Sequence, residues 1–385
     1  MEIWEKLSAD IFLSELMLDG VISGLSVRYL AENTDITDIR ELYFSKDLLF
    51  SLQGKKKSEK NFLSEVERER RKDYAKKMAE RMVDKGIFSV SFQDKEYPSN
   101  FSFFSGMPII LYGKGKYELV EKSKGGLICI VGTRRPSMYG LKVVKEAVEA
   151  FCRQDICIVS GLARGIDTMA HKTALSNKGN TIAVLAGGLD DVYPKENKGL
   201  FDRISVEGCV LSELPPGRRP LRQFFPARNR ILSALSDLVL IAEAGAYSGT
   251  LHTASFAAAQ GKDVFVTPGN IYAPQSVGCL SLLKDGAEMY TKPTDMIERL
   301  TDIGFYREMD KIKGNKKKED APVSLMEKPV DKCDILIECI QIKDKSLDDL
   351  LEETGIPFQE MILLLAELEI SKRILEVDGK YTYLY

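Results

Sequence analysis

The sequence predicts an α/β protein with a parallel sheet at its centre, a helical domain before it and a small module of helices and strands after it. Short apolar runs alternate with helical patterns in the middle third, strand signals are scarce before residue 86, and the last 55 residues give three helical patterns and a hairpin. Near-continuous apolar strands separated by helices are typical of a parallel sheet covered on both faces.

Residues 1–85 predict the N-terminal helical domain. Two short helical patterns, IFLSELMLDGVISGLSVRYLAEN and ITDIRELYFSKDLL, precede a highly charged helix expected from about Lys60 to Asp84. Residues 51–86 hold twelve Lys/Arg against seven Asp/Glu, a net charge of +5. The ordinary interpretation of such a charge run is a solvated helix face.

Residues 86–303 predict a Rossmann-like domain. Its expected strands are LICIV at 127, ICIVS at 156, TIAVLA at 181, CVLSE at 209, DLVLIAE at 237 and DVFVT at 263. The helical patterns between them are YGLKVVKEAVEAFCRQ, TMAHKTALSN, NKGLFDRIS, RNRILSALS and TASFAAAQG. Strand and helix signals alternate as a parallel sheet with helices on both faces requires.

The C-terminal residues predict a linker and a winged helix. The lysine-rich stretch KIKGNKKKEDAPVS lies in the expected flexible linker, residues 304–330. Residues 331–385 give the helices DILIECIQ, SLDDLLEETG and PFQEMILLLAELEISKR, and a hairpin turning at Asp378-Gly379. This module has thirteen acidic and six basic residues, so its net charge of −7 repels phosphate. We expect it to contact protein, such as a partner subunit, instead of DNA.

Composition and missing motifs exclude several classes of protein. The net charge is −3, the seven cysteines include no C-x-x-C pair, and there are only two histidines. We therefore expect reduced thiols, no metal site and a cytoplasmic protein, since no stretch approaches the roughly 20 apolar residues that cross a bilayer. No Walker lysine motif and no G-x-G-x-x-G after the first strand are present, so no nucleotide cofactor is expected.

Glycine-rich loops follow four of the expected strands. They are Gly132-Thr133-Arg134-Arg135, Gly161-Leu162-Ala163-Arg164, Gly187-Gly188-Leu189-Asp190 and Ala244-Gly245-Ala246-Tyr247-Ser248-Gly249-Thr250, and Pro268-Gly269-Asn270 follows a fifth. Ligands of open parallel sheets bind at the carboxyl ends of the strands. Glycine lets the backbone approach an anion closely, so these loops favour a phosphate-binding rim, although glycines also serve plain turns.

An arginine-rich segment, PPGRRPLRQFFPARNR at 215–230, holds five arginines and no acid. Guanidinium groups suit phosphate oxygens, and aromatic faces can stack on unpaired bases. This combination favours single-stranded nucleic acid over a free nucleotide. The alternative, a core phenylalanine and structural ion pairs, is expected for one of Phe224 and Phe225 and for some of the arginines.

Isolated polar residues give weaker indications. His171 lies in an alanine-rich helical pattern and is expected to be a packing residue, whereas His252 lies near the rim and could touch a ligand. Asp190 and Asp191 stand near Glu196, but the intervening Tyr193-Pro194 indicates a turn, so a paired-carboxylate catalyst is the less favoured interpretation.

The ordered motifs resemble those of the DprA/Smf family. VGTRRPSMYG, SGLARGIDTMAH, TIAVLAGGLDDVYPKEN, SELPPGRRP, FPARNRILSALS, EAGAYSGTLHTA and VTPGN carry the resemblance over about residues 125–290. It implies a non-catalytic factor of natural transformation that binds and protects incoming single-stranded DNA, loads the RecA recombinase and acts as a homodimer. It also implies an N-terminal sterile-alpha-motif-like or helix-hairpin-helix domain, although ISGLS here lacks the second glycine of the family's turn.

Motif matching selects Arg134 and Arg228 as the expected phosphate contacts, with Lys142 as a lesser candidate. The expected site is Gly132, Thr133, Arg134, Ser160, Gly161, Arg164, Phe225, Arg228, Asn229, Ser248, Gly249 and Thr250.

Two other classes compete with this interpretation. The core also resembles nucleotide phosphoribohydrolases of the lysine-decarboxylase-like (LOG) family, whose signature is P-G-G-x-G-T-x-x-E. Their glutamate falls on Thr253, which cannot act as a carboxylate. A scaffold with a vestigial rim is the third class, and the retained Arg134 and arginine-rich segment disfavour it.

Overall fold

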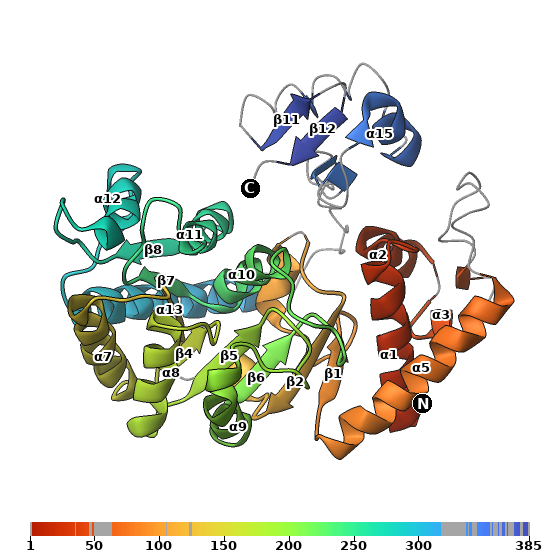
Figure 1. Cartoon of the computed structure of the whole chain (residues 1–385), viewed down its shortest axis with the longest axis horizontal. Coiled ribbons are helices and arrows are strands. Elements are labelled where there is room, and N and C mark those ends of the chain that lie inside the picture. Colours follow the sequence, from red (N-terminus) through yellow and green to blue (C-terminus); the bar gives the residue numbers. More distant parts are fainter. Residues whose placement is uncertain are drawn as a thin grey trace. The chain divides into compact units, whose positions relative to one another are not determined.

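The computed structural model describes residues 2–34, 36–45, 48–49, 64–104, 106–122 and 125–316, and in the C-terminal part 336–337, 339–340, 345–354, 356, 361, 364–365, 368, 373–377 and 380–383. The chain divides into two compact units, Met1–Ile312 and Lys313–Tyr385 (Figure 1).

A nine-stranded sheet forms the centre of the first unit, in the order β1-β2-β6-β5-β4-β3-β7-β8-β9. The six strands expected from the sequence are all present and mutually parallel: β3 (Leu127–Val131), β4 (Cys157–Ser160), β5 (Thr181–Leu185), β6 (Cys209–Ser212), β7 (Leu238–Ile241) and β8 (Asp263–Val266). A short parallel strand, β9 (Glu288–Met289), ends the sheet beside β8.

The parallel sheet expected from the sequence forms the core, and two further strands that were not expected extend it antiparallel at one edge. β1 (Phe88–Ser91) pairs antiparallel with β2 (Ile110–Gly115), which in turn pairs antiparallel with β6. The sheet is therefore mixed. The parallel strands are predicted from apolar runs that alternate with helical patterns. β1 and β2 are not part of that alternation, so the sequence contains no such signal for them.

Helices cover both faces of the sheet because its strands are apolar on both sides (Figure 1). In β3, Cys129 packs in one cluster with Ile231 of α10, whereas Ile130 packs in another with Val148 of α7. The helices of this part are α6 (Leu119–Lys122), α7 (Met138–Cys152), α8 (Ile166–Ser176), α9 (Lys198–Glu207), α10 (Phe224–Leu235), α11 (Thr250–Ala259), α12 (Val277–Lys284) and α13 (Pro293–Lys316), with short 3-10 turns at Ser99–Phe103, Lys195–Asn197 and Pro274–Ser276. Because α13 continues to Lys316, the first part of the expected linker, 304–330, is helical.

The N-terminal helices are α1 (Ile3–Leu18), α2 (Gly24–Asn33), α3 (Glu41–Phe44) and α5 (Glu65–Asp84). Helix α5 is the charged helix expected from the sequence, capped by Ser64; residues 60–63 lie outside the described part. The guanidinium of Arg40 bonds Asp10 of α1 at 2.8 Å and Asp94 beyond β1 at 2.7 Å. Apolar side chains of these helices also share one cluster with Tyr112 of β2. The helical region is thereby packed on the edge of the sheet.

The second unit contains a three-stranded antiparallel sheet, β10 (Lys345–Ser346), β12 (Lys380–Tyr383) and β11 (Ile374–Val377), and helix α15 (Leu347–Thr354). The expected hairpin is present as the β11–β12 pair, whose last partners are Val377 and Lys380. Its turn residues, Asp378 and Gly379, lie outside the described part, as does most of the third expected helix. Across the described residues of the whole chain, no helix is both long and apolar enough to span a membrane.

Candidate functional site

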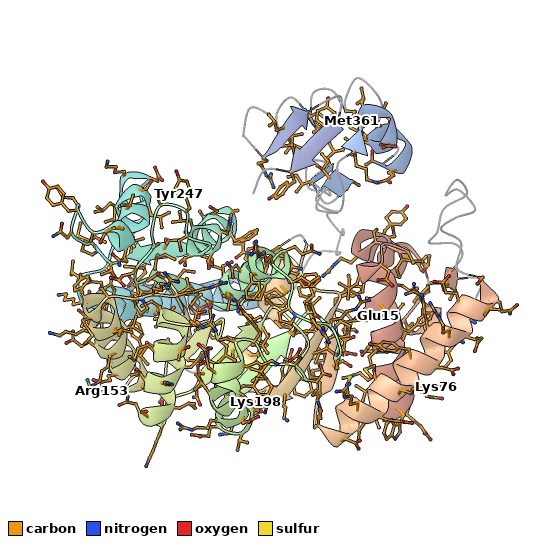
Figure 2. The ribbon with its side chains drawn as sticks, viewed as in Figure 1. Glu15, Lys76, Arg153, Lys198, Tyr247 and Met361 are labelled. Atoms are coloured by element: carbon orange, nitrogen blue, oxygen red, sulfur yellow. The ribbon has the colours of Figure 1, made fainter. Side chains whose placement is uncertain are left out.

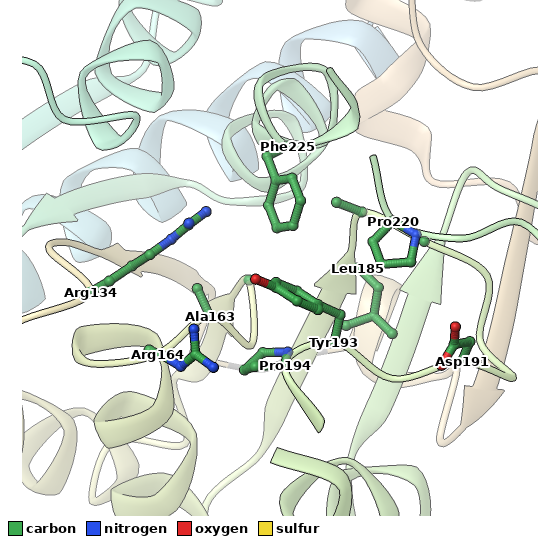
Figure 3. A pocket seen from close by; sticks show the side chains of 12 residues that line it. Arg134, Ala163, Arg164, Leu185, Asp191, Tyr193, Pro194, Pro220 and Phe225 are labelled. Carbon is green, nitrogen blue, oxygen red and sulfur yellow. The ribbon is translucent and has the colours of Figure 1, made fainter. Parts of the chain in front are cut away.

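The carboxyl edge of the parallel strands carries two hollows. The sheet order reverses there between β3 and β7, the position at which open α/β sheets hold ligands. The first hollow, called the arginine pocket, is lined by Arg134, Gly161, Ala163, Arg164, Leu185, Ala186, Gly187, Asp191, Tyr193, Pro194, Pro220 and Phe225 (Figure 3). The second, called the glutamate groove, is lined by Ser137, Tyr139, Glu243, Pro268, Gly269, Asn270, Ala273, Gln275 and Ser276.

Two glycines let the loops after β3 and β4 pack against their neighbours. A Cβ on Gly161 would lie 2.2 Å from Nη1 of Arg228, so any larger residue there would displace the Arg228 guanidinium. Gly165, at φ 76°, begins α8 in the left-handed region, and a Cβ there would lie 2.4 Å from the carbonyl oxygen of Thr133. The sequence therefore holds these two loops in contact, with Arg134 exposed between them.

Phe225 forms the aromatic side of the arginine pocket. Its ring is partly buried near the start of α10, and Cζ of Arg134 lies 5.2 Å from the ring centroid. Tyr193 meets the same ring edge-on at 5.8 Å between centroids. Figure 3 shows Arg134 and Tyr193 pointing toward Phe225 from different loops. An exposed guanidinium thus stands beside an aromatic face that is open to a pocket.

Arg228 lies beneath this pocket and is only 6% exposed. Its Nη1 donates to the carbonyl oxygens of Gly161, at 2.7 Å, and Val184. Its Nε donates to Asn229 at 3.2 Å. The guanidinium therefore joins the loops after β4 and β5 from below, and three of its hydrogen bonds are made within the protein.

The buried groups around Arg228 have shifted pKa values. Burial raises the pKa of Asp167, while the Arg228 charge and the amides of Ala163 and Gly161 act in the opposite direction. Burial, helped by the Arg228 charge, lowers the pKa of His171 to about 3, so this imidazole is neutral at pH 7. Nδ1 of His171 is 2.7 Å from the Thr181 hydroxyl. His171 is thus the packing residue that the sequence predicts.

The five arginines of residues 215–230 differ in their surroundings. Arg218 pairs with Glu15, Arg230 pairs with Glu213, and Arg228 is buried. Arg219 and Arg222 are exposed and make no ion pair within the described part of the chain. Three of the five therefore hold the protein together, and two are available to a ligand.

The remaining expected site residues lie around the pocket. Arg164 lines it but pairs through Nε with Glu196 at 2.5 Å. The Ser160 hydroxyl donates to the Ile130 carbonyl at 2.6 Å and is fully buried. Lys142, on α7, lies 3.8 Å from Glu146. The others connect strand-end loops or cap α11: Gly132 and Thr133 after β3, Asn229 bonding the Gly249 carbonyl at 3.2 Å, and Ser248 accepting from the Thr250 amide at 3.3 Å.

Sequence reasoning missed Tyr193 and Pro220 as pocket residues. Both lie in segments whose prolines indicate only turns. Neither belongs to a glycine-rich loop that directly follows an expected strand. Pro220 reaches the pocket because it lies over Gly187, at 3.1 Å from an ideal Gly187 Cβ position, and Tyr193 reaches it by packing on Phe225. No local signal in the sequence gives such a contact.

Two acidic residues near the pocket make internal contacts, whereas Asp191, which lines the pocket, is exposed. Asp190 accepts from the Gly217 amide at 2.7 Å, and Glu196 pairs with Arg164. Thr253, which takes the place of the phosphoribohydrolase glutamate, is fully buried. Within the described residues, no three His, Cys, Asp or Glu side chains gather as metal ligands would.

Comparisons with known proteins agree with this geometry. The family model of DNA recombination-mediator protein A matches residues 88–301. The chain is 40% identical over 217 residues to DNA processing protein DprA of Bacillus subtilis, covering 56% of this chain and 72% of that protein. It is 34% identical over 295 residues to protein Smf of Escherichia coli, covering 75% of each.

Two solved structures are similar to the fold. One is DprA from Streptococcus pneumoniae, with a TM-score of 0.62 and 33% identity, covering 77% of this chain and 98% of that one. The other is DNA processing protein A from Helicobacter pylori, described for its single-stranded DNA binding mode, with a TM-score of 0.51 and 30% identity over 56% of this chain and 96% of that one.

Proposed function

The chain belongs to the DNA recombination-mediator protein A family, the family of DprA and Smf proteins, and from this membership we propose that it binds single-stranded DNA at the arginine pocket. The observation that carries the proposal is the exposed guanidinium of Arg134 at 5.2 Å from the Phe225 ring. A phosphate and an unpaired base require these two groups, a cation and a stacking face, next to each other.

Binding of this kind is independent of sequence. Phosphate oxygens are the same in every nucleotide, and each base has a face that can stack. In duplex DNA the bases are already stacked and paired, so Phe225 has no free face to meet. Single strands are therefore the favoured ligand, with Arg134, Arg219 and Arg222 supplying positive charge.

Arg228 has a different role in this proposal from the one expected of it. Because its guanidinium is 6% exposed and bonds the Gly161 and Val184 carbonyls, it supports the pocket floor and adds a positive potential beneath a bound phosphate. Arg164 can add a direct contact once it leaves Glu196, an exposed partner.

We further propose that the protein is not an enzyme and passes its DNA to a RecA recombinase. Thr253 lacks the carboxyl group that the phosphoribohydrolase reaction needs, and the nearby acids Asp190 and Glu196 are held by internal partners. Protection of incoming DNA and loading of the recombinase are the family role that the motifs imply.

Homodimerisation and the C-terminal domain complete the proposal. A dimer formed through the Rossmann-like domain, residues 86–303, would place two arginine pockets on one strand and raise its affinity through bivalence. The three-stranded sheet and α15 support a winged helix at 331–385, and its net charge of −7 favours a protein partner. Light scattering measured with size-exclusion chromatography tests the dimer.

The test of DNA binding is fluorescence anisotropy with labelled single-stranded and double-stranded oligonucleotides across a salt series. Arg134→Ala is compared with Arg153→Ala, which removes the same charge at the other end of α7 (Figure 2). We expect stronger binding of single strands, and a loss of about tenfold for Arg134→Ala with a flatter salt dependence. Equal affinities of the two variants would show that the arginine pocket is not the DNA site.

A further inference from the structure

Two acidic residues of helix α1 hold one arginine of the arginine-rich segment. Glu15 accepts two hydrogen bonds from Arg218, at 2.8 Å from Nε and 2.5 Å from Nη2. Asp19, one helical turn later, accepts from the same Nη2 at 3.2 Å. Figure 2 shows Glu15 on the side of α1 toward the α/β body. An N-terminal helix is thus bonded directly to the segment beside the arginine pocket.

Helix α5 takes part in the same contact from the other side. Arg71 of α5 donates to Asp19 at 2.7 Å, so Asp19 lies between two arginines. Burial alone would raise the pKa of Asp19, but the bonds from Arg71 and Arg218 outweigh it and hold that pKa below its ordinary value. Asp19 therefore stays charged under all ordinary conditions.

A second contact lies one residue before Arg218. The Gly217 amide donates to Asp190, and Arg81 of α5 lies 3.5 Å from the other oxygen of Asp190. Gly217 has φ 88°, and a Cβ on it would lie 2.9 Å from the Tyr74 hydroxyl of α5. The segment therefore passes close to α5 in a conformation that favours glycine.

We call the contacts of Glu15, Asp19, Arg71 and Arg218 the acid clasp. The acid clasp differs from an ordinary surface ion pair. The Glu15 side chain is 11% exposed and that of Arg218 is 32% exposed, and the pair is bidentate. Bidentate arginine–carboxylate pairs with restricted side chains are the geometry in which an ion pair fixes orientation as well as lowering energy. The clasp can therefore define where the segment lies.

The residues that follow Arg218 belong to the arginine pocket. The Arg218 carbonyl accepts from the Gly188 amide at 2.8 Å, and Pro220 lines the pocket beside Gly187. Arg219 and Arg222, on either side of Pro220, are exposed and make no ion pair with any described residue. Fixing Arg218 thus fixes the backbone that carries Pro220, a pocket residue, and the two exposed cations that flank it in the sequence.

We propose that the acid clasp makes the N-terminal helices positioning elements for DNA binding: Glu15 and Asp19 hold Arg218, and thereby fix the segment that carries Pro220 of the pocket wall and the exposed Arg219 and Arg222. This inference rests on the proposed single-stranded DNA binding. Its consequence is unusual for a ligand that is a polyanion. Two carboxylates close to the site strengthen binding, although by charge alone they oppose it.

Electrostatics and positioning predict opposite changes in DNA affinity when a clasp carboxylate is removed, and this difference is the basis of the experiment. Glu15→Gln removes a negative charge near the DNA, so electrostatics alone predicts an unchanged or increased affinity. Loss of positioning predicts a decrease, and for Glu15→Gln with Asp19→Asn we expect about threefold to tenfold weaker binding of a labelled oligonucleotide. Glu80→Gln is the matched control for the single Glu15→Gln variant, because Glu80 is exposed on α5 and its substitution also removes one negative charge, without a contact to the clasp.

A mutant cycle separates positioning from direct contact by Arg218. If Arg218 acts only through the clasp, Arg218→Gln and Glu15→Gln each weaken binding, and the double variant binds about as weakly as either one. If Arg218 itself meets phosphate, Glu15→Gln frees it and strengthens binding, which overturns the proposal. Trypsin gives a second measurement on the folded full chain. Cleavage after Arg218 or Arg222 should be faster in Glu15→Gln and unchanged in Glu80→Gln.

The controls keep this proposal distinct from the proposed function. Affinities are compared well below the melting temperature of each variant, so that only folded protein is measured. Suppose that the wild type binds single strands and that Arg134→Ala lowers the affinity. If the clasp variants then have the same affinity as Glu80→Gln, the clasp has no positioning role. If wild type does not bind single strands, the proposed function itself fails.

Discussion

The arginine pocket and the glutamate groove lie along the same carboxyl edge of one sheet and differ in the charge beneath them. Both are built from strand-end loops and the first turns of helices, with β3 contributing to each. The buried charge under the pocket is the guanidinium of Arg228. The buried charge lining the groove is the carboxylate of Glu243, which accepts from the amide and hydroxyl of Ser137 at 2.8 and 2.5 Å.

This difference shows that strand-end geometry alone does not make a phosphate site. Strand-end loops line both hollows, but a carboxylate opposes a second anion nearby and a guanidinium attracts one. Arg134 and Phe225 then add an exposed cation and a stacking face to the pocket only. We expect single-stranded DNA to use the pocket and not to enter the groove with its phosphates.

The largest expected effect follows from removing the charge beneath the pocket. Arg228→Met keeps much of the side-chain volume but leaves the carbonyls of Gly161 and Val184 without their donor and Asp167 without its nearby positive charge. We expect the free energy of unfolding to fall by about 3 kcal/mol or more, measured by urea denaturation. A change below about 1 kcal/mol would show that this buried cation does not support the pocket.

The next effect compares one aromatic residue from each hollow. Phe225→Ala removes the stacking face of the pocket, and we expect single-stranded DNA affinity to fall by about 1–3 kcal/mol, roughly fivefold to 150-fold. Tyr139→Ala removes an aromatic ring from the groove, where its hydroxyl donates to the Pro268 carbonyl at 2.9 Å. We expect that variant to bind within about twofold of wild type. Equal losses in anisotropy titrations would mean that DNA occupies both hollows.

Burial of His171, next to the charge of Arg228, makes the stability of the fold depend on pH. Its folded pKa of about 3 lies below the unfolded value of about 6.5, so the unfolded chain takes up a proton first as the pH falls. The stability that neutral His171 contributes is complete above pH 6.5 and is lost progressively toward pH 3. By pH 5.5 the loss is about 1.4 kcal/mol.

Urea denaturation at pH 7.5 and 5.5 tests this linkage in wild type and His171→Gln. The substitution is expected to lower stability at both pH values because His171 is fully buried. The difference between the two pH values should nevertheless be smaller in the variant by about 1.4 kcal/mol. If the difference in unfolding free energy between the two pH values is the same in the variant and the wild type, groups other than His171 cause the loss of stability in acid.

The comparison of the two hollows also explains what the sequence could predict. Apolar runs locate the six parallel strands, and because parallel strands end at one edge, the loops after β3 and β4 could be placed together from sequence alone. The antiparallel edge formed by β1 and β2 has no comparable pattern. Whether an arginine faces a ligand or the interior depends on contacts far along the chain, such as Arg218 with Glu15, 203 residues away.

The same limit applies to the roles of single residues. Arg134 and Arg228 stand in equally distinctive motifs, yet Arg134 is exposed and Arg228 is buried, with 6% of its surface accessible. The direction of a side chain from a helix depends on what packs above it, here the Gly161 loop, and no local period encodes that. Gly161 is a sequence signal for the burial of Arg228, but it can be interpreted only when Arg228 is known to be its neighbour in space.

The smallest expected effect concerns the second compact unit. Removing residues 317–385 takes away a net charge of −7 without touching the described contacts of the arginine pocket. Its acidic side chains repel phosphate, and at physiological salt, where the Debye length is about 8 Å, the repulsion between exposed charges is largely screened. We therefore expect the shortened chain to bind a labelled single strand within about twofold of the full chain at 0.15 M salt, with any change toward tighter binding at low salt. A tenfold loss would show that the C-terminal domain contacts DNA in spite of its charge, and that the chemistry of the sheet edge does not by itself account for the affinity.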